Sequence, residues 1–143
     1  MTTLLLVSIL AATAIANWPG PVLSLEGQAS QLVSDIRYTQ AISMNQEQRY
    51  RINFASDRYW LSNQDGTVTI DLPANGQSEV LMEPGIALTT SQGFVVFGKD
   101  GTPYSDAATP GTPLAADDVI TLSSGATSKT VTISPETGRV LLQ

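Results

Sequence analysis

Residues 25–36 read LEGQASQLVSDI, and this stretch decides how the N-terminal part of the chain folds. Its apolar side chains recur at the spacing that places them on one face of an α-helix, and they are Leu25, Ala29, Leu32, Val33 and Ile36. Polar side chains fill the other faces, and they are Glu26, Gln28, Gln31, Asp35 and Arg37. The spacing predicts an amphipathic helix that continues to about Asn45 and packs its apolar stripe on the rest of the molecule. Ile42 lies off the stripe, so we expect the far end of the helix to bend or to contact another element.

An apolar run without any charged residue, residues 1–16, precedes this helix. As a helix it would extend about 24 Å, against the roughly 30 Å hydrocarbon core of a membrane. No basic residue precedes the run, which favours a retained anchor over a removed secretory signal. Trp18 stands where an interfacial aromatic belongs, and the alternative is that it packs on the head. Pro19 and Pro21 break or kink a continuous helix. The side chains that we expect in the membrane are Leu4, Leu5, Leu6, Val7, Ile9, Leu10 and Ile15.

The remainder of the chain alternates polar and apolar residues in the manner of short β-strands. Residues 49–54 and 59–61 flank a turn and predict a hairpin, in which Tyr59 and Trp60 project to opposite faces. Further strands are predicted at residues 67–72, 78–82, 86–89, 94–97, 119–122, 129–133 and 139–142. The pattern predicts an α+β fold in which an antiparallel, sandwich-like β-head packs on the N-terminal helix. We expect three segments, namely a membrane helix at 1–18, an amphipathic helix at 19–45 and the β-head at 46–143.

The composition excludes several kinds of chemistry. The 143 residues include no Cys and no His, which removes disulfides, Ser-His-Asp and Cys-His catalysis, and metal sites built from these side chains. The net charge of −6 disfavours attraction to nucleic acid and to anionic lipid. No apolar pocket that would raise the pKa of one carboxyl group can be read from the sequence, so a pair of acid and base carboxylates is not indicated. We predict that the chain is not an enzyme and needs no cofactor.

Two sets of charged residues are candidate binding sites. Four aspartates border a loop rich in Gly, Pro and Thr and could supply oxygen ligands to Ca²⁺, although the spacing of an EF-hand is absent; they are Asp100, Asp106, Asp117 and Asp118. Arg49 and Arg51 share one strand face, and Arg139 could join them in an anion-binding or DNA-binding patch with Arg37 and Arg58. Solvated side chains remain the favoured interpretation of both sets.

Four stretches in order resemble a known family. They are residues 31–42 (QLVSDIRYTQAI), 49–54 (RYRINF), 96–103 (VFGKDGTP) and 131–140 (VTISPETGRV). The chain is similar to the minor pseudopilins of the type IV pilin-like family, namely the H-type subunit of type II secretion and the minor pilins of fimbriae and of mannose-sensitive haemagglutinin pili. In these proteins a Thr-Gly-Arg turn leads into the last strand. We therefore expect Gly138 at positive φ and the final strand inside the sheet.

The resemblance implies a non-enzymatic subunit with its N-terminal helix in the inner membrane and its head in the periplasm. Its partners would be other pilins and the inner-membrane assembly platform, and it would initiate or cap a pilus or pseudopilus. Residues 4–7 are not preceded by the family's basic leader, its Gly cleavage position or its early acidic residue. We therefore expect the natural chain to begin upstream of Met1. We also expect it to carry the N-terminal processing and methylation of the family. The alternatives are a minor pilin that binds DNA for uptake and a secreted or anchored β-sandwich binding domain.

Overall fold

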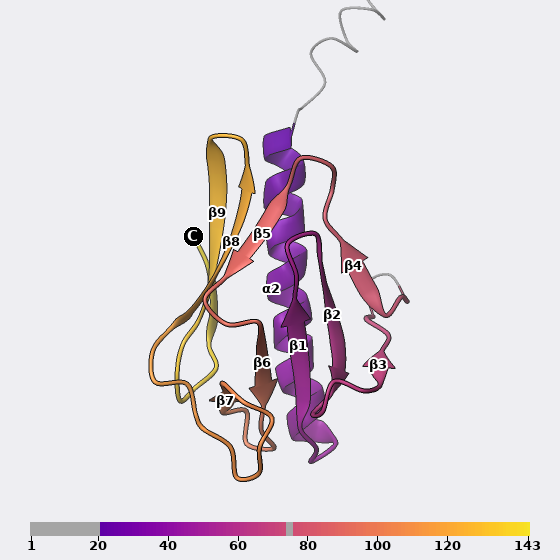
Figure 1. The fold of residues 1–143 in the computed structure, drawn as a ribbon, viewed down its shortest axis with the longest axis vertical. Coiled ribbons are helices and arrows are strands. Elements are labelled where there is room, and N and C mark those ends of the chain that lie inside the picture. Colours follow the sequence, from indigo (N-terminus) through magenta and orange to yellow (C-terminus); the bar gives the residue numbers. More distant parts are fainter. Residues whose placement is uncertain (1–20, 74–75) are drawn as a thin grey trace, which may run out of the picture.

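A long helix forms the spine of the molecule, and two antiparallel sheets flank it (Figure 1). The structure, a computed structural model, describes residues 21–73 and 76–143, and these contain one helix and ten strands. Helix α2 (Pro21–Asn45) begins at a proline, which is favourable because the missing N–H would have no partner in the first turn. The helix ends where Glu47 adopts a φ of 52°. The predicted end at about Asn45 is confirmed.

The first sheet has six strands in the order β3-β2-β1-β6-β7, with β4 also paired to β2. Strands β1 (Tyr50–Phe54) and β2 (Arg58–Asn63) form the predicted hairpin. The other strands are β3 (Thr69–Ile70), β4 (Glu79–Leu81), β6 (Phe94–Phe97) and β7 (Pro103–Tyr104). Strands β3 and β4 both pair with the edge of β2 that faces away from β1. The chain therefore returns to this edge twice.

The second sheet has four strands in the order β10-β9-β8-β5. They are β5 (Ala87–Thr90), β8 (Asp118–Ser124), β9 (Thr127–Ile133) and β10 (Val140–Leu142). The turn into β10 contains Gly138 at a φ of 66°, as predicted. The last strand pairs in the sheet, as predicted, but its position is the edge and not the interior, because β9 is its one neighbour.

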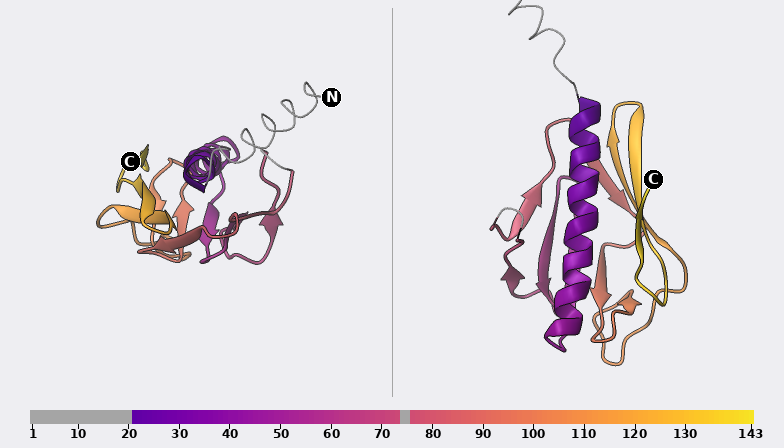
Figure 2. Two further views of the ribbon diagram at one scale, coloured as in Figure 1. Left: turned by 90° about the horizontal axis from the view of Figure 1, so that it is seen from above. Right: turned by 180° about the vertical axis from the view of Figure 1, so that it is seen from behind.

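The core lies between the helix and the inner faces of both sheets. The predicted apolar stripe of α2 is buried, with Leu25, Leu32 and Ile36 each at 0% exposure. It packs on β1 and β6 of the first sheet and on β8, β9 and β10 of the second. The right view of Figure 2 shows α2 in front of the two sheets, with its outer side uncovered. The predicted α+β class, a helix packed on an antiparallel head, is confirmed.

Two predictions about local structure are wrong, and one strand was not predicted. Asp35 was expected on an outer face of the helix but is 1% exposed. The strand predicted at residues 67–72 is reduced to β3, because the Asn63 side chain accepts hydrogen bonds from the N–H groups of Thr67 and Val68 and prolongs the turn. Strand β7 was missed, since its two residues include a proline.

Candidate functional site: the helix spine and the outer sheet face

The buried side of α2 contains a carboxyl group in the middle of the core. The Tyr59 hydroxyl on β2 donates a hydrogen bond of 2.7 Å to Oδ2 of Asp35, and the Tyr59 side chain is fully buried. Burial raises the pKa of Asp35, and the hydrogen bond from Tyr59 opposes this rise in part. Burial also raises the pKa of Tyr59, and the neighbouring Asp35 carboxyl adds to that effect. The pair fixes the helix to the first sheet at one position.

Further along the helix the buried stripe becomes polar. The hydroxyl groups of Thr39 and Ser43 are buried and donate to the carbonyl oxygens of Asp35 and Thr39, each over 2.8 Å. These bonds keep two hydroxyl groups satisfied without a partner from the sheets. Apolar periodicity does not predict that Asp35, Thr39 and Ser43 are buried, because it follows apolar side chains only. Ile42, which it placed off the stripe, is buried too.

One side chain of the helix joins both sheets at a second position. The Gln40 side-chain amide donates to the carbonyl oxygen of Gly101, in the turn between β6 and β7, over 2.9 Å. It also donates to the carbonyl oxygen of Thr137, in the turn before β10, over 3.0 Å. The helix is therefore held by hydrogen bonds as well as by apolar packing, and its orientation relative to the head is set on both sides.

The opposite side of α2 is a continuous exposed stripe, which we call the outer stripe. Its members recur at intervals of three and four residues, and four of the six are small; they are Gly27, Ser30, Ser34, Arg37, Ala41 and Met44. Met44 is 48% exposed although it is apolar. Small side chains permit another helix to approach closely. The outer stripe is thus a surface suited to helix packing.

The predicted arginine patch is divided between two parts of the molecule. Arg49 donates hydrogen bonds of 2.7 and 2.6 Å to the carbonyl oxygens of Ala108 and Pro110, and its guanidinium lies 4.5 Å from the centroid of the Tyr104 ring. Arg51 lies 4.3 Å from the Phe94 ring centroid on the same sheet face, and burial lowers its pKa. Arg139 instead precedes β10 of the second sheet and is exposed.

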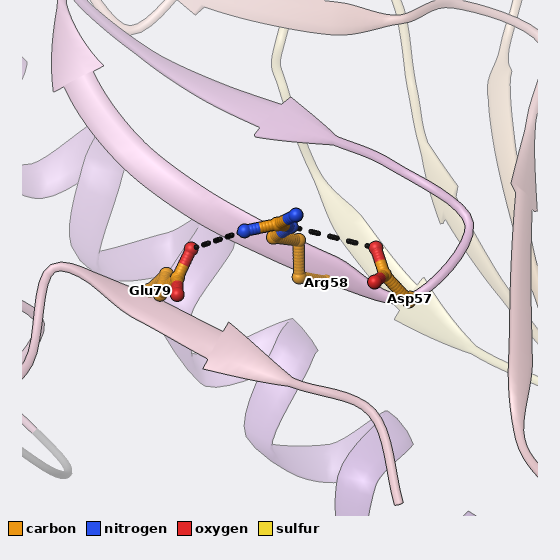
Figure 3. Close-up of polar contacts among 3 residues, drawn as sticks. All are labelled: Asp57, Arg58 and Glu79. Atoms are coloured by element: carbon orange, nitrogen blue, oxygen red, sulfur yellow. Dashed lines mark hydrogen bonds and ion pairs between the residues drawn. The ribbon is translucent and has the colours of Figure 1, made fainter. Parts of the chain in front are cut away.

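The other two arginines also make contacts within the chain. Arg37 donates to the carbonyl oxygen of Val140 over 3.0 Å and so links the helix to the last strand. Arg58 lies between two carboxylates, with Nε 3.4 Å from Asp57 and a terminal nitrogen 3.1 Å from Glu79 (Figure 3). Four of the five arginines therefore contribute to the internal arrangement of the head.

The four aspartates of the predicted calcium loop have different environments. Hydrogen bonds from Thr102 hold the pKa of Asp100 below its usual value, and those from Thr112 do the same for Asp106. Asp118 was expected to be solvated, but it is 1% exposed on β8 and accepts a 2.5 Å hydrogen bond from Ser91. Burial raises the pKa of Asp118. Within the described residues, no three acidic side chains come close enough to hold a metal ion.

Comparison with solved structures shows the same fold in a minor pilin and in a minor pseudopilin. The type IV minor pilin FimU of Pseudomonas aeruginosa is 13% identical, and the match covers 83% of this chain and 87% of FimU with a TM-score of 0.61. The minor pseudopilin EpsH of the type 2 secretion system of Vibrio cholerae is 12% identical, and the match covers 84% of this chain and 96% of EpsH with a TM-score of 0.63. No family model and no curated protein matches the sequence. At this identity the comparison shows the fold, which is pilin-like.

Within residues 21–73 and 76–143, no helix has the length and the apolar character that crossing a membrane requires. The predicted membrane-facing side chains from Leu4 to Ile15 lie outside the described residues.

Proposed function

We propose that the chain is a minor pilin or pseudopilin subunit of a type IV pilus or a type II secretion system. The observation that supports this most strongly is the helix α2, which both sheets hold on one side and leave open on the other. FimU, a type IV minor pilin, and EpsH, a minor pseudopilin of a secretion system, have the same fold. In the proposed role the subunit joins other pilins through its helix and initiates or caps the fibre.

The proposed arrangement follows the three expected segments. Residues 1–18 anchor the subunit in the inner membrane before assembly, and the head at 46–143 stays in the periplasm. In the fibre, residues 1–18 pack among the helices of neighbouring subunits, and the outer stripe of α2 faces the next subunit. Packing of small side chains and exclusion of water from apolar ones drive this association. The inner-membrane assembly platform would be a further partner of the subunit.

The anchor can be tested with a single charge in the apolar run. Leu6→Arg or Ile9→Arg places a guanidinium in the hydrocarbon at a cost of about 2.5–3.5 kcal/mol on insertion scales. We expect either variant to lose membrane retention and entry into the fibre, as measured by membrane fractionation and by recovery in sheared fibres. Asn17→Arg, at the expected membrane boundary, is the matched control and should behave like the parent chain. Normal fractionation of both core variants would refute the anchor.

The outer stripe can be tested separately from the anchor. Ser34→Trp adds bulk at the centre of the stripe, where a neighbouring helix would otherwise approach closely. We expect the variant to melt at the parent's temperature, since Ser34 is exposed, but to be depleted from the fibre. Thr89→Trp on the exposed side of β5 adds the same bulk elsewhere and should assemble normally. Equal incorporation of the two variants would show that α2 does not face another subunit.

A further inference from the structure

The face of the first sheet that α2 does not cover carries a row of side chains from four strands. Register pairs Phe94 of β6 with Asn53 of β1, Asn53 with Trp60 of β2, and Trp60 with Glu79 of β4. Directly paired residues project to the same face and lie next to each other. Trp60 and Glu79 are therefore neighbours on this outer face, although β3 and its flanking turns separate them in the chain.

A hollow lies beside Trp60 on this face. Its volume is about 250 Å³, and its lining consists of Ala55, Arg58, Trp60, Thr69, Ser78 and Glu79. The Trp60 side chain is partly exposed, whereas its neighbour Tyr59 is buried in the core. The Trp60 backbone carbonyl accepts a hydrogen bond from the Asn53 side-chain amide over 3.2 Å. The indole lines the hollow at a partly exposed position, so its ring and its N–H can contact a ligand there.

The charged side of the hollow is held in place by the ion pairs of Figure 3. Arg58 contacts Asp57 through Nε and Glu79 through a terminal nitrogen, which leaves further guanidinium N–H groups as donors. The pairs also hold the guanidinium between two strands, since Asp57 and Arg58 lie at the start of β2 and Glu79 lies on β4. Hydrogen-bond donors and acceptors therefore lie next to one flat apolar ring.

We propose that this hollow binds the ring of a neutral sugar. A pyranose presents C–H groups on one face, which suits the indole of Trp60, and hydroxyl groups around its edge, which suit Arg58, Glu79, Thr69 and Ser78. An anion would meet the Glu79 carboxylate, which already pairs with Arg58, and a cation would meet the Arg58 guanidinium with only one aromatic ring to attract it. The volume is below the roughly 300–1,000 Å³ of sites for drug-sized ligands, which fits a single sugar ring.

The experiment uses the full chain in a detergent without a sugar headgroup. The chain has two tryptophans, so Trp18→Phe leaves Trp60 as the only indole fluorophore. The probes are methyl mannoside, methyl galactoside and N-acetylglucosamine, with glucuronate as the anion and choline as the cation. We expect at least one neutral sugar to change the fluorescence saturably with a dissociation constant on the order of 1 mM, as suits a small ligand. Saturation-transfer NMR on the ligand provides a second readout that needs no fluorophore.

Variants decide whether the signal comes from the hollow. Trp60→Ala should abolish saturation transfer to the sugar, Trp60→Phe should weaken it less, and Glu79→Gln should weaken it several-fold with little change of shape. Val119→Ser, on an exposed part of the second sheet, is the control and should bind like the parent chain. Melting curves establish that each variant is folded. The proposal is overturned if no neutral sugar binds, if choline or glucuronate binds in its place, or if folded Trp60→Ala retains binding. The sugar-binding proposal is independent of the pilin assignment, because the experiment measures sugar binding and not fibre assembly.

Discussion

The hydrogen bond between Tyr59 and Asp35 makes a strong prediction about stability. Tyr59→Phe keeps the buried ring but removes the hydroxyl, and Oδ2 of Asp35 then loses its bond from a side chain that is 0% exposed. A buried acceptor left without a partner costs about 1–3 kcal/mol. For a chain of this size, each kcal/mol lowers the melting temperature by about 3–5 °C. We therefore expect a loss of roughly 3–15 °C at neutral pH.

The same substitution elsewhere in the core provides a matched control. Tyr50 is also buried, but its hydroxyl donates to the exposed side chains of Gln46 and Gln48. Tyr50→Phe should change the melting temperature little, because water can replace those contacts. Thermal denaturation followed by circular dichroism measures the melting temperature of both variants. If Tyr59→Phe melts with the parent chain and with Tyr50→Phe, the buried bond does not stabilise the fold and the reasoning fails.

The pH dependence of stability tests the ionisation of Asp35. Because burial raises the pKa of Asp35 above its ordinary value of 3.8, the folded chain binds this proton more tightly than the unfolded chain does. The resulting stability is fully present below the ordinary value and is lost as the pH rises through the pKa of the folded state. Asp35→Asn cannot ionise, so its stability relative to the parent should increase as the pH rises from about 3 to 7. A constant difference over this range would show that Asp35 does not titrate as inferred.

The remaining predictions concern the helix stripe and the C-terminal turn. Leu32→Ala and Ile36→Ala should each lower the free energy of unfolding by about 2–5 kcal/mol. The control Ser34→Ala, at an exposed position, should change it by less than about 0.5 kcal/mol. Equally small losses in all three variants would place the apolar stripe outside the core. Removing residues 139–143 exposes the edge of β9 and should unfold or aggregate the head, and a truncated chain that melts like the full one would contradict this. Gly138→Ala should destabilise by more than about 1 kcal/mol, because the added Cβ would lie 2.8 Å from the Gly101 carbonyl oxygen at a positive φ. Gly125→Ala is the control, because Gly125 has a φ of 61° and no heavy atom lies within 4 Å of the added Cβ. This variant measures the cost of the backbone conformation alone. An equal loss of unfolding free energy in both variants would show that the contact with Gly101 adds nothing.

The sequence predicted the parts of the fold that follow from local periodicity. The apolar stripe of α2, the hairpin of β1 and β2, and strand β6 at residues 94–97 all lie where the pattern placed them. Local periodicity failed where a side chain altered the backbone, as when Asn63 prolonged the turn past Val68. It also failed at Asp35, because a polar residue enters a buried stripe only when a partner exists. That partner, Tyr59, lies 24 residues away and is visible only after folding.

The outer sheet face shows why a site of this kind escapes sequence analysis. Alternation in the hairpin predicted that Tyr59 and Trp60 point to opposite faces, and the structure places Tyr59 in the core. Alternation contains no information on which strand lies next to β2, since β3 follows it in the chain and yet β4 supplies the neighbour of Trp60. The juxtaposition of Trp60, Arg58 and Glu79 arises because two short strands share one edge of β2. A shift of β4 by one residue would turn Glu79 away from Trp60 and place Ser78 or Val80 opposite it. The chemistry of the hollow therefore depends on long-range register, which ion pairing of Arg58 with Glu79 helps to hold.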